Sequence, residues 1–174
     1  MNYATIKDTD IANGEGVRVS LFVSGCTHHC KNCFNKETWD FNYGNEFSAQ
    51  AQDQILQMIK PSYITGLTLL GGEPMEPQNQ RGLFPFIKKF KEVFGDTKTI
   101  WCYTGFVFDK DLKPGGKAYT EVTDQLLNYF NVMVDGPFVD GLKDISLKFR
   151  GSSNQRIIDV KKSLEQNKVV LYMQ

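Results

Sequence analysis

The order of apolar and polar positions along the chain predicts strands that alternate with helices. Four mostly apolar runs have the length of buried strands, and each is followed by turn residues or by a cysteine-rich loop. These runs are residues 17–23, 64–70, 97–103 and 131–137. A further short strand is expected at 169–172, whereas 156–166 reads equally as a helix or as a strand with a turn.

Apolar side chains at helical spacing predict three helices between these strands. Ser48 is placed to cap a helix that runs to about Lys60, where Pro61 stops it. Aromatic and aliphatic residues recur at three- and four-residue spacing over 83–94, and Gly95 ends that helix. A third helix is expected over 122–130. The aromatic stripe of the second helix is expected to lie in the core.

Alternating strands and helices predict an α/β fold with a mostly parallel sheet. In such sheets the loops beyond the carboxyl ends of the strands gather on one rim, where binding sites form. With 174 residues, the chain is too short for a closed eight-stranded barrel, which needs about 250. We therefore expect an open, partial (β/α) barrel and a single domain over residues 1–174.

Composition adds little to this prediction of the fold, but it bears on the cellular compartment. Lys plus Arg and Asp plus Glu number 20 each, so the zero net charge gives no reason to expect nucleic acid as a partner. The first residues lack a signal-peptide pattern, and no apolar run is long enough for a membrane span. Four cysteines, three of them crowded together, favour reduced thiols in the cytoplasm over a disulfide framework.

The crowded cysteines are Cys26, Cys30 and Cys33, directly after the first predicted strand. Their spacing, with three residues and then two between them, closes a short loop around a metal centre and leaves one coordination position without a protein ligand. An iron–sulfur cube has four irons, so three thiolates can hold it and leave the fourth iron open. The three cysteines are therefore the candidate metal ligands and the centre of the candidate catalytic site.

The alternative for these cysteines is a structural zinc site, in which Cys102, His28 or His29 supplies the fourth ligand. Zinc sites usually pair two Cys-x-x-Cys or Cys/His units, and only one such unit is present. Cys102 lies within an apolar strand and is expected to be a core thiol. The two histidines are expected in the loop, exposed or donating to the cluster's surroundings.

Several segments resemble the activating proteins of anaerobic (class III) ribonucleotide reductases, which belong to the radical S-adenosylmethionine (SAM) superfamily. The cluster-loop match is Gly-Cys-Thr-His-His-Cys-Lys-Asn-Cys-Phe-Asn at 25–35, followed by Trp39. The pairing of this three-cysteine loop with Gly-Gly-Glu-Pro at 71–74 resembles radical SAM enzymes in general. Further matching segments are 13–18, 101–105, 132–138 and 150–156. One departure is Asn32, since radical SAM proteins often carry an aromatic residue at this position.

The resemblance implies a [4Fe-4S] cluster on the three cysteines, with SAM bound through its amino and carboxylate groups to the open iron. The residues expected around SAM are Asn32, Cys33, Phe34, Gly71, Gly72, Glu73, Thr104 and Asp135. Gly71 and Gly72 lack side chains and so admit close backbone approach, while Glu73 accepts from the ammonium group or fixes its loop. Phe34 is the candidate to pack on adenine. Asp135 is a candidate for the ribose hydroxyls, or else it starts a turn.

The resemblance also implies the reaction, an oxidoreductase chemistry in which SAM is cleaved and a glycyl radical is made on the anaerobic ribonucleotide reductase. A low-potential donor such as flavodoxin or ferredoxin would supply the electron. Two alternatives stay open at this point. One is activation of another glycyl-radical enzyme, such as pyruvate formate-lyase, and the other is a non-catalytic metal or electron-transfer protein.

Overall fold

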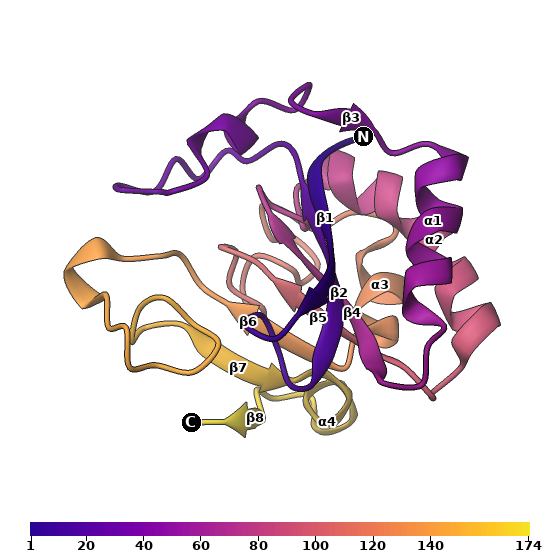
Figure 1. The fold of residues 1–174 in the computed structure, drawn as a ribbon. Coiled ribbons are helices and arrows are strands. Elements are labelled where there is room, and N and C mark those ends of the chain that lie inside the picture. The colour runs from indigo at the N-terminus through magenta and orange to yellow at the C-terminus, as the bar shows by residue number, and fades with distance from the viewer.

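The computed structural model describes residues 1–174 as one eight-stranded sheet with helices packed on one face (Figure 1). In spatial order the strands are β3 (Asn45–Glu46), β1 (Asn2–Asp10), β2 (Val17–Val23), β4 (Ile64–Gly71), β5 (Thr99–Tyr103), β6 (Val132–Asp135), β7 (Arg156–Asp159) and β8 (Leu171–Met173). The helices are α1 (Ala49–Ile59), α2 (Pro77–Phe94), α3 (Thr123–Tyr129) and α4 (Val160–Gln166), with short 3₁₀ helices η1 (Lys36–Trp39) and η2 (Asp140–Leu142).

The centre of the sheet is parallel and its flanks are antiparallel. The three pairs that join β2, β4, β5 and β6 are parallel. The four pairs that involve β1, β3, β7 and β8 are antiparallel, so the expectation of a mostly parallel sheet is wrong. Only residues 11–16 separate β1 from β2, and a parallel crossover needs a dozen residues or more. The mixed α/β class is confirmed.

The predicted helices are present, and one is longer than its apolar pattern indicated. Ser48 caps α1 by accepting from the backbone N–H of Ala51 at 3.2 Å, and Pro61 follows the end of that helix. Helix α2 begins at Pro77, six residues before the first apolar position of the stripe. Its first turns were missed because their buried residues are the polar Asn79 and Gln80. None of the helices combines the length and the apolar composition that a membrane-spanning segment requires.

Alternate residues of the central strands divide the sheet into two different faces. The face under the helices forms a core of 28 buried residues, including the aromatic stripe of α2 and Cys102 as predicted. Burial raises the pKa of the Cys102 thiol well above its usual value. On the opposite face, Arg18 lies beneath Trp101 with a guanidinium–ring distance of 5.6 Å, and its N–H groups are all engaged by hydroxyl and carbonyl oxygens.

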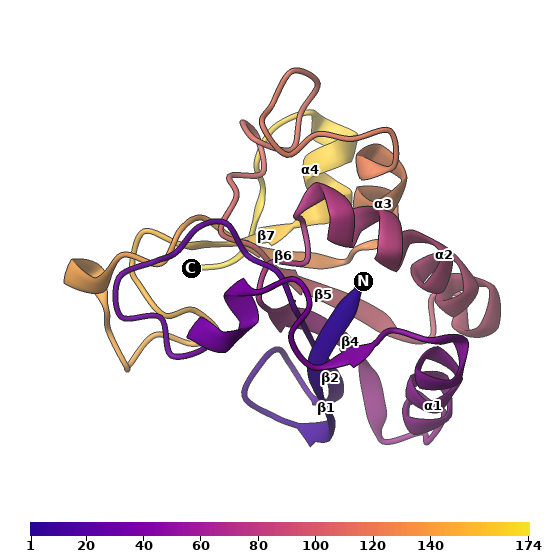
Figure 2. The ribbon, with the colours of Figure 1, turned by 90° about the horizontal axis from the view of Figure 1, so that it is seen from above.

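The face opposite the helices carries the loops that matter for function. Figure 2 shows the four helices on one side of the sheet and the long loops after β2 and β6 projecting from the other. Residues 156–166, which the sequence left open between helix and strand, form strand β7 followed directly by helix α4. Because the loops after β2 and β6 both leave the carboxyl ends of parallel strands, they project from the same rim.

Candidate cluster and cofactor site

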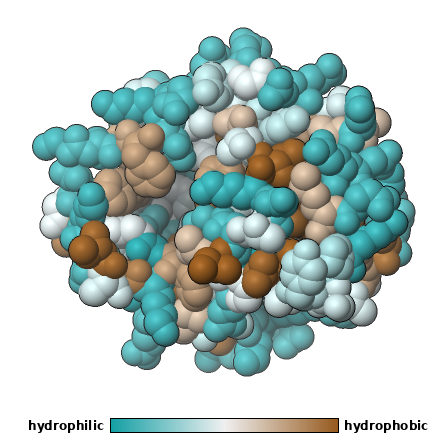
Figure 3. Space-filling view, in the orientation of Figure 1, coloured by the Kyte–Doolittle hydropathy of each residue, from teal (hydrophilic) through white to brown (hydrophobic).

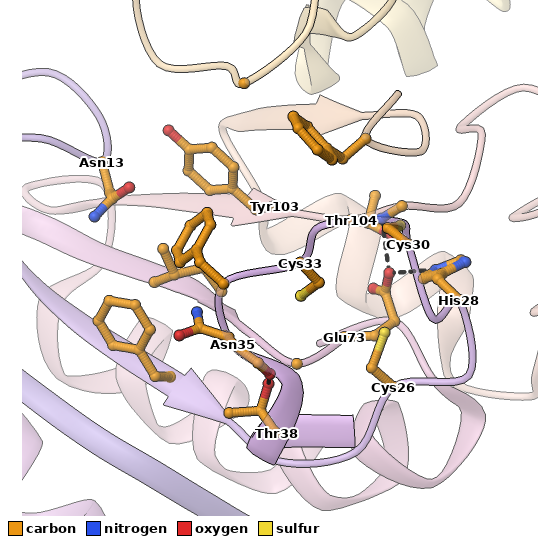
Figure 4. A pocket seen from close by; sticks show the side chains of 18 of the residues that line it. Asn13, Cys26, His28, Cys30, Cys33, Asn35, Thr38, Glu73, Tyr103 and Thr104 are labelled. Carbon is orange, nitrogen blue, oxygen red and sulfur yellow. Dashed lines mark hydrogen bonds and ion pairs between the residues drawn. The ribbon is translucent and has the colours of Figure 1, made fainter. Parts of the chain in front are cut away.

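A cavity of about 480 Å³ opens at the carboxyl ends of the parallel strands. The surface is hollowed between the projecting loops (Figure 3), and Figure 4 shows the cavity from close by. Its volume falls within the range of about 300–1,000 Å³ that small-molecule sites occupy. Its lining includes Cys26, Cys30 and Cys33 with segments from the loops after β4, β5 and β6, namely Gly71–Glu73, Thr104–Gly105 and Gly136. The predicted convergence of these loops on one rim is confirmed.

The three cysteines surround the cavity as half-buried free thiols. No three side chains of His, Cys, Asp or Glu lie close enough to share one metal ion. An iron–sulfur cluster takes each thiolate on a different iron, so its ligands need not converge on one point. Three thiols spread around one cavity fit this arrangement.

Burial acts on the protonation state of two of these thiols, Cys26 and Cys30. Burial raises the pKa of Cys26 to about 12, and it also raises the pKa of Cys30 above its usual value. Both groups are therefore protonated thiols at neutral pH until a metal binds. Metal ligation requires thiolates, so loading of the site is coupled to the loss of these protons.

The cysteine loop is anchored to η1 and to the start of α2 by backbone and side-chain contacts. The backbone N–H of Gly25 donates to the carbonyl oxygen of Thr38 at 2.7 Å. The Glu76 carboxylate, which no sequence pattern singled out, accepts from the backbone N–H and the hydroxyl of Thr27 at 2.7 and 2.6 Å. The ring of His29 stacks on Trp39 with centroids 4.2 Å apart. These contacts fix the loop before any metal binds.

Glu73 joins the cysteine loop to the loop after β5. Its Oε2 accepts from Nε2 of His28 and from the backbone N–H of Gly105, each at 2.7 Å, and its Oε1 accepts from the N–H of Met75 at 2.8 Å (Figure 4). Burial lowers the pKa of His28, but the hydrogen bond and charge of Glu73 raise it more, so the net pKa is raised. Of the two roles expected for Glu73, the structure favours fixing the loop, since its carboxylate is only 1% exposed.

Gly71 and Gly72 are required by contacts within the protein. A Cβ atom at Gly72 would lie 2.7 Å from the carbonyl oxygen of Gly25 and 2.9 Å from that of Thr38. Gly71 has φ +106°, a conformation that side chains disfavour, and its Cβ would meet the backbone of Phe22 at 2.7 Å. Both glycines line the cavity, but the lack of a side chain at Gly72 chiefly lets its loop pack against the cysteine loop.

The structure gives Asp135 contacts within the protein that the sequence did not indicate. Its carboxylate is 0% exposed and accepts from the N–H of Phe108 at 2.7 Å and from Nε and Nη2 of Arg156 at 2.9 and 2.6 Å. Asp135 and Arg156 lie directly opposite each other in the antiparallel β6–β7 pair. The carboxylate is engaged by this ion pair and does not line the cavity, so the structure supports a role in joining β6 to β7 and gives no support to the expected contact with ribose.

The other expected SAM contacts differ in where they lie. Phe34 and Thr104 line the cavity, and the Phe34 side chain is 91% exposed at its edge. Asn32 does not line the cavity; it adopts φ +59° and donates through Nδ2 to Asp140 Oδ2 at 3.0 Å on the surface. The contact joins the cysteine loop to the loop after β6. Asn32 thus holds two loops together, in place of the expected contact with a ligand.

Two buried donors in the cavity lining have no partner in the protein. They are the hydroxyl of Tyr103 and Nε of Arg150. Unpaired buried polar groups are rare in folded proteins, and each calls for a partner that the protein itself does not provide. Three thiols beside two free donors fit a cluster next to a polar organic ligand. Neither donor was identified from sequence, although Arg150 begins the segment 150–156 that resembles the activating proteins.

Comparison with known proteins agrees with this geometry. Residues 12–158 match the family described as a 4Fe-4S single cluster domain. The anaerobic ribonucleoside-triphosphate reductase-activating protein of Pasteurella multocida is 45% identical over 159 residues, which cover 90% of this chain and 96% of that protein. The protein of the same name from Escherichia coli K12 is 40% identical over 89% of this chain and 96% of its own length. That of Enterobacteria phage T4 is 38% identical, over 90% and 93%.

Proposed function

The chain belongs to the family of anaerobic ribonucleoside-triphosphate reductase-activating proteins, and from that premise we propose that it is a radical SAM activase. It cleaves SAM with one electron. The radical formed from SAM then takes a hydrogen atom from the anaerobic ribonucleotide reductase. One hydrogen atom leaves the α-carbon of a glycine of that partner and ends in 5′-deoxyadenosine. The partner keeps the glycyl radical.

One observation carries this proposal, namely that Cys26, Cys30 and Cys33 share a cavity with the Gly71–Glu73 loop. Three thiolates leave one iron of a cube without a protein ligand, which makes room for an organic molecule on that iron. When bound, the reduced cluster supplies the electron that divides SAM into methionine and a 5′-deoxyadenosyl radical. We assign the three cysteines to the cluster and the Gly71–Glu73 loop to the methionine end of SAM.

The chain's own residues hold the parts in place. Glu73 connects the cysteine loop to Gly105 and so keeps the cluster side and the SAM side of the cavity in register. Thr104 and Phe34 line the cavity where they can contact the nucleoside, with Phe34 packing on adenine. Such fixed positioning lowers the entropic cost of bringing the reacting atoms together.

The open sheet suits a protein substrate. We interpret the sheet, whose order runs from β3 to β8 without closing, as the partial barrel of a radical SAM domain that spans residues 1–174. Because the cavity opens between projecting loops, a glycine-bearing segment of the reductase can enter and shield the site from water. We place the reaction in the reducing cytoplasm, since all four cysteines are free thiols, with flavodoxin or ferredoxin as electron donor.

Anaerobic reconstitution with iron and sulfide, followed by spin resonance, tests this proposal. Reduced protein, SAM and the anaerobic reductase together should give a glycyl radical signal, and deuterium at the glycine α-carbon should appear in 5′-deoxyadenosine. Cys30→Ser should abolish the cluster and the signal. Cys102→Ser is the matched control, because this thiol is buried in the helix-side core, and it should retain both.

Two results would contradict the proposal. If SAM is cleaved but no label moves and no radical forms on the reductase, the protein is not its activase. A signal that appears only with pyruvate formate-lyase would instead assign a different glycyl-radical partner. Loss of the cluster in Cys102→Ser would exclude the three-cysteine site.

A further inference from the structure

The loop after β6 holds the side chain of Arg150 in a fixed place. Gln155 organises this loop: its Oε1 accepts from the N–H of Gly151 at 2.9 Å, and its Nε2 donates to the carbonyl oxygen of Gly136 at 3.1 Å. The backbone oxygen of Gln155 accepts from Nη1 of Arg150 at 2.8 Å. On the other side of Arg150, Phe149 adopts φ +57° and packs edge-on against Trp101. The guanidinium is thus positioned by its own loop.

Arg150 is the one arginine whose charge has neither an ion-pair partner nor a full set of hydrogen bonds. Arg81 and Arg156 pair with carboxylates, and the N–H groups of Arg18 are all engaged by oxygens. Arg150 forms no ion pair, and its Nε is buried without a partner in the cavity lining. Arg150 is half-buried and its buried Nε lacks an acceptor, so a group that accepts hydrogen bonds, best of all an anion, is expected beside this guanidinium in the cavity.

The position of Arg150 relative to the cysteines limits which anion it can bind. Phe138 lines the cavity together with Cys30 and Arg150. The ring of Phe138 also lies against Gly151, where an added Cβ would approach it to 3.1 Å. Cys30, Phe138 and the loop that carries Arg150 therefore contribute to one cavity. An anion on Arg150 would lie in the cavity that the proposed cluster ligands line.

We propose that Arg150 binds the carboxylate of the methionine moiety of SAM, an inference that rests on the proposed function. SAM carries a cationic sulfonium and a cationic ammonium group, so the carboxylate is its only anion. The free edge of the guanidinium, formed by Nε and Nη2, makes no hydrogen bond within the protein. That edge presents two parallel N–H groups, the arrangement that matches a carboxylate. Arg150 positions the methionine end while Nη1 stays anchored to Gln155.

Binding measurements on the reconstituted, oxidised protein, which does not turn SAM over, test this assignment. SAM is compared with its decarboxylated analogue, in which the carboxylate is replaced by hydrogen. Arg150→Gln should raise the Kd for SAM by about ten- to hundredfold and should change the Kd for the decarboxylated analogue by less than about threefold. Arg150→Lys, which keeps the charge but not the paired donors, should recover part of the preference for SAM.

Lys148→Gln is the matched control, since Lys148 is an exposed cation of the same loop and lies outside the cavity lining. It should leave both Kd values within about twofold. Equal loss of affinity for the two ligands in Arg150→Gln would overturn the carboxylate assignment. So would a wild-type protein that binds both ligands equally well, a result that needs no variant to fold. Failure of the wild type to bind SAM at all would overturn the proposed function, and the inference with it.

Discussion

Replacing Asp135 with asparagine separates a structural carboxylate from one that binds a ligand. The carboxylate is fully buried and accepts three hydrogen bonds, two of them from the guanidinium of Arg156. Asparagine keeps one acceptor oxygen but loses the charge. Its amide NH₂ group would face the guanidinium of Arg156, which has only N–H donors and cannot accept a hydrogen bond. Arg156 retains Asp109 at 2.8 Å, which limits the cost.

The magnitude follows from these contacts. A hydrogen bond to a charged group contributes about 1.5–3 kcal/mol, and part of one such interaction survives through Asp109, so Asp135→Asn should lower the free energy of unfolding by about 2–4 kcal/mol. For a chain of this size, 1 kcal/mol shifts the midpoint of thermal unfolding by about 2–4 °C. The midpoint, followed by circular dichroism under anaerobic conditions, should therefore fall by roughly 5–15 °C.

The same variant should bind SAM as the wild type does, when measured well below its unfolding midpoint, because Asp135 does not line the cavity. Asp53→Asn is the matched control: its carboxylate is 61% exposed in an ion pair with Lys89, so the midpoint should hardly move. An unchanged midpoint in Asp135→Asn together with a tenfold or greater loss of SAM affinity would refute this reasoning. That result would instead indicate that Asp135 binds SAM.

Two further predictions concern the cysteine loop and acid stability. Gly72→Ala should lower the iron content after reconstitution, because the new Cβ meets the carbonyl oxygen of Gly25 at 2.7 Å; Gly141→Ala, with nothing within 4 Å, should not. Burial raises the pKa of Asp10, but its hydrogen bonds lower it more, so the folded-state pKa lies below the unfolded value of 3.8. The resulting stabilisation is complete at pH values above the unfolded pKa and is lost as pH falls through the folded pKa. Asp10→Asn should therefore make the free energy of unfolding fall less steeply with decreasing pH in this acid range. An equally steep fall in the variant would contradict this.

The central strands and the convergence of their loops could be predicted from sequence because buried parallel strands are continuous apolar runs. Strand β1 could not, since all of its residues except the last are half-buried or exposed without a regular alternation, and three acidic or basic side chains lie in its second half. The short connection to β2 decides that β1 pairs antiparallel with β2. The strand propensities of the individual residues do not indicate this pairing.

The residues of the site also differ in how far the sequence could predict them. The cysteine spacing locates the proposed cluster ligands because those residues act together within one short loop. The contacts of Asp135 were not indicated because its partner, Arg156, comes from a strand 21 residues later that pairs in the opposite direction. Likewise, Glu76 and Arg150 acquire their meaning only from contacts made across the fold. Sequence reasoning found residues defined by local spacing and missed those defined by long-range pairing.

The two outermost strands, β3 and β8, have a consequence for how another protein can be recognised. β3 contains two residues and pairs only with Asn2 and Tyr3, so the outer edge of β1 from residue 4 onward has no strand beside it. Lys7 and Asp8 are exposed on this uncovered stretch, and charged side chains on an edge disfavour edge-to-edge pairing between copies of the chain. Strand addition by a second protein is therefore opposed by charge at the β1 edge and by the short length of β8 at the other edge.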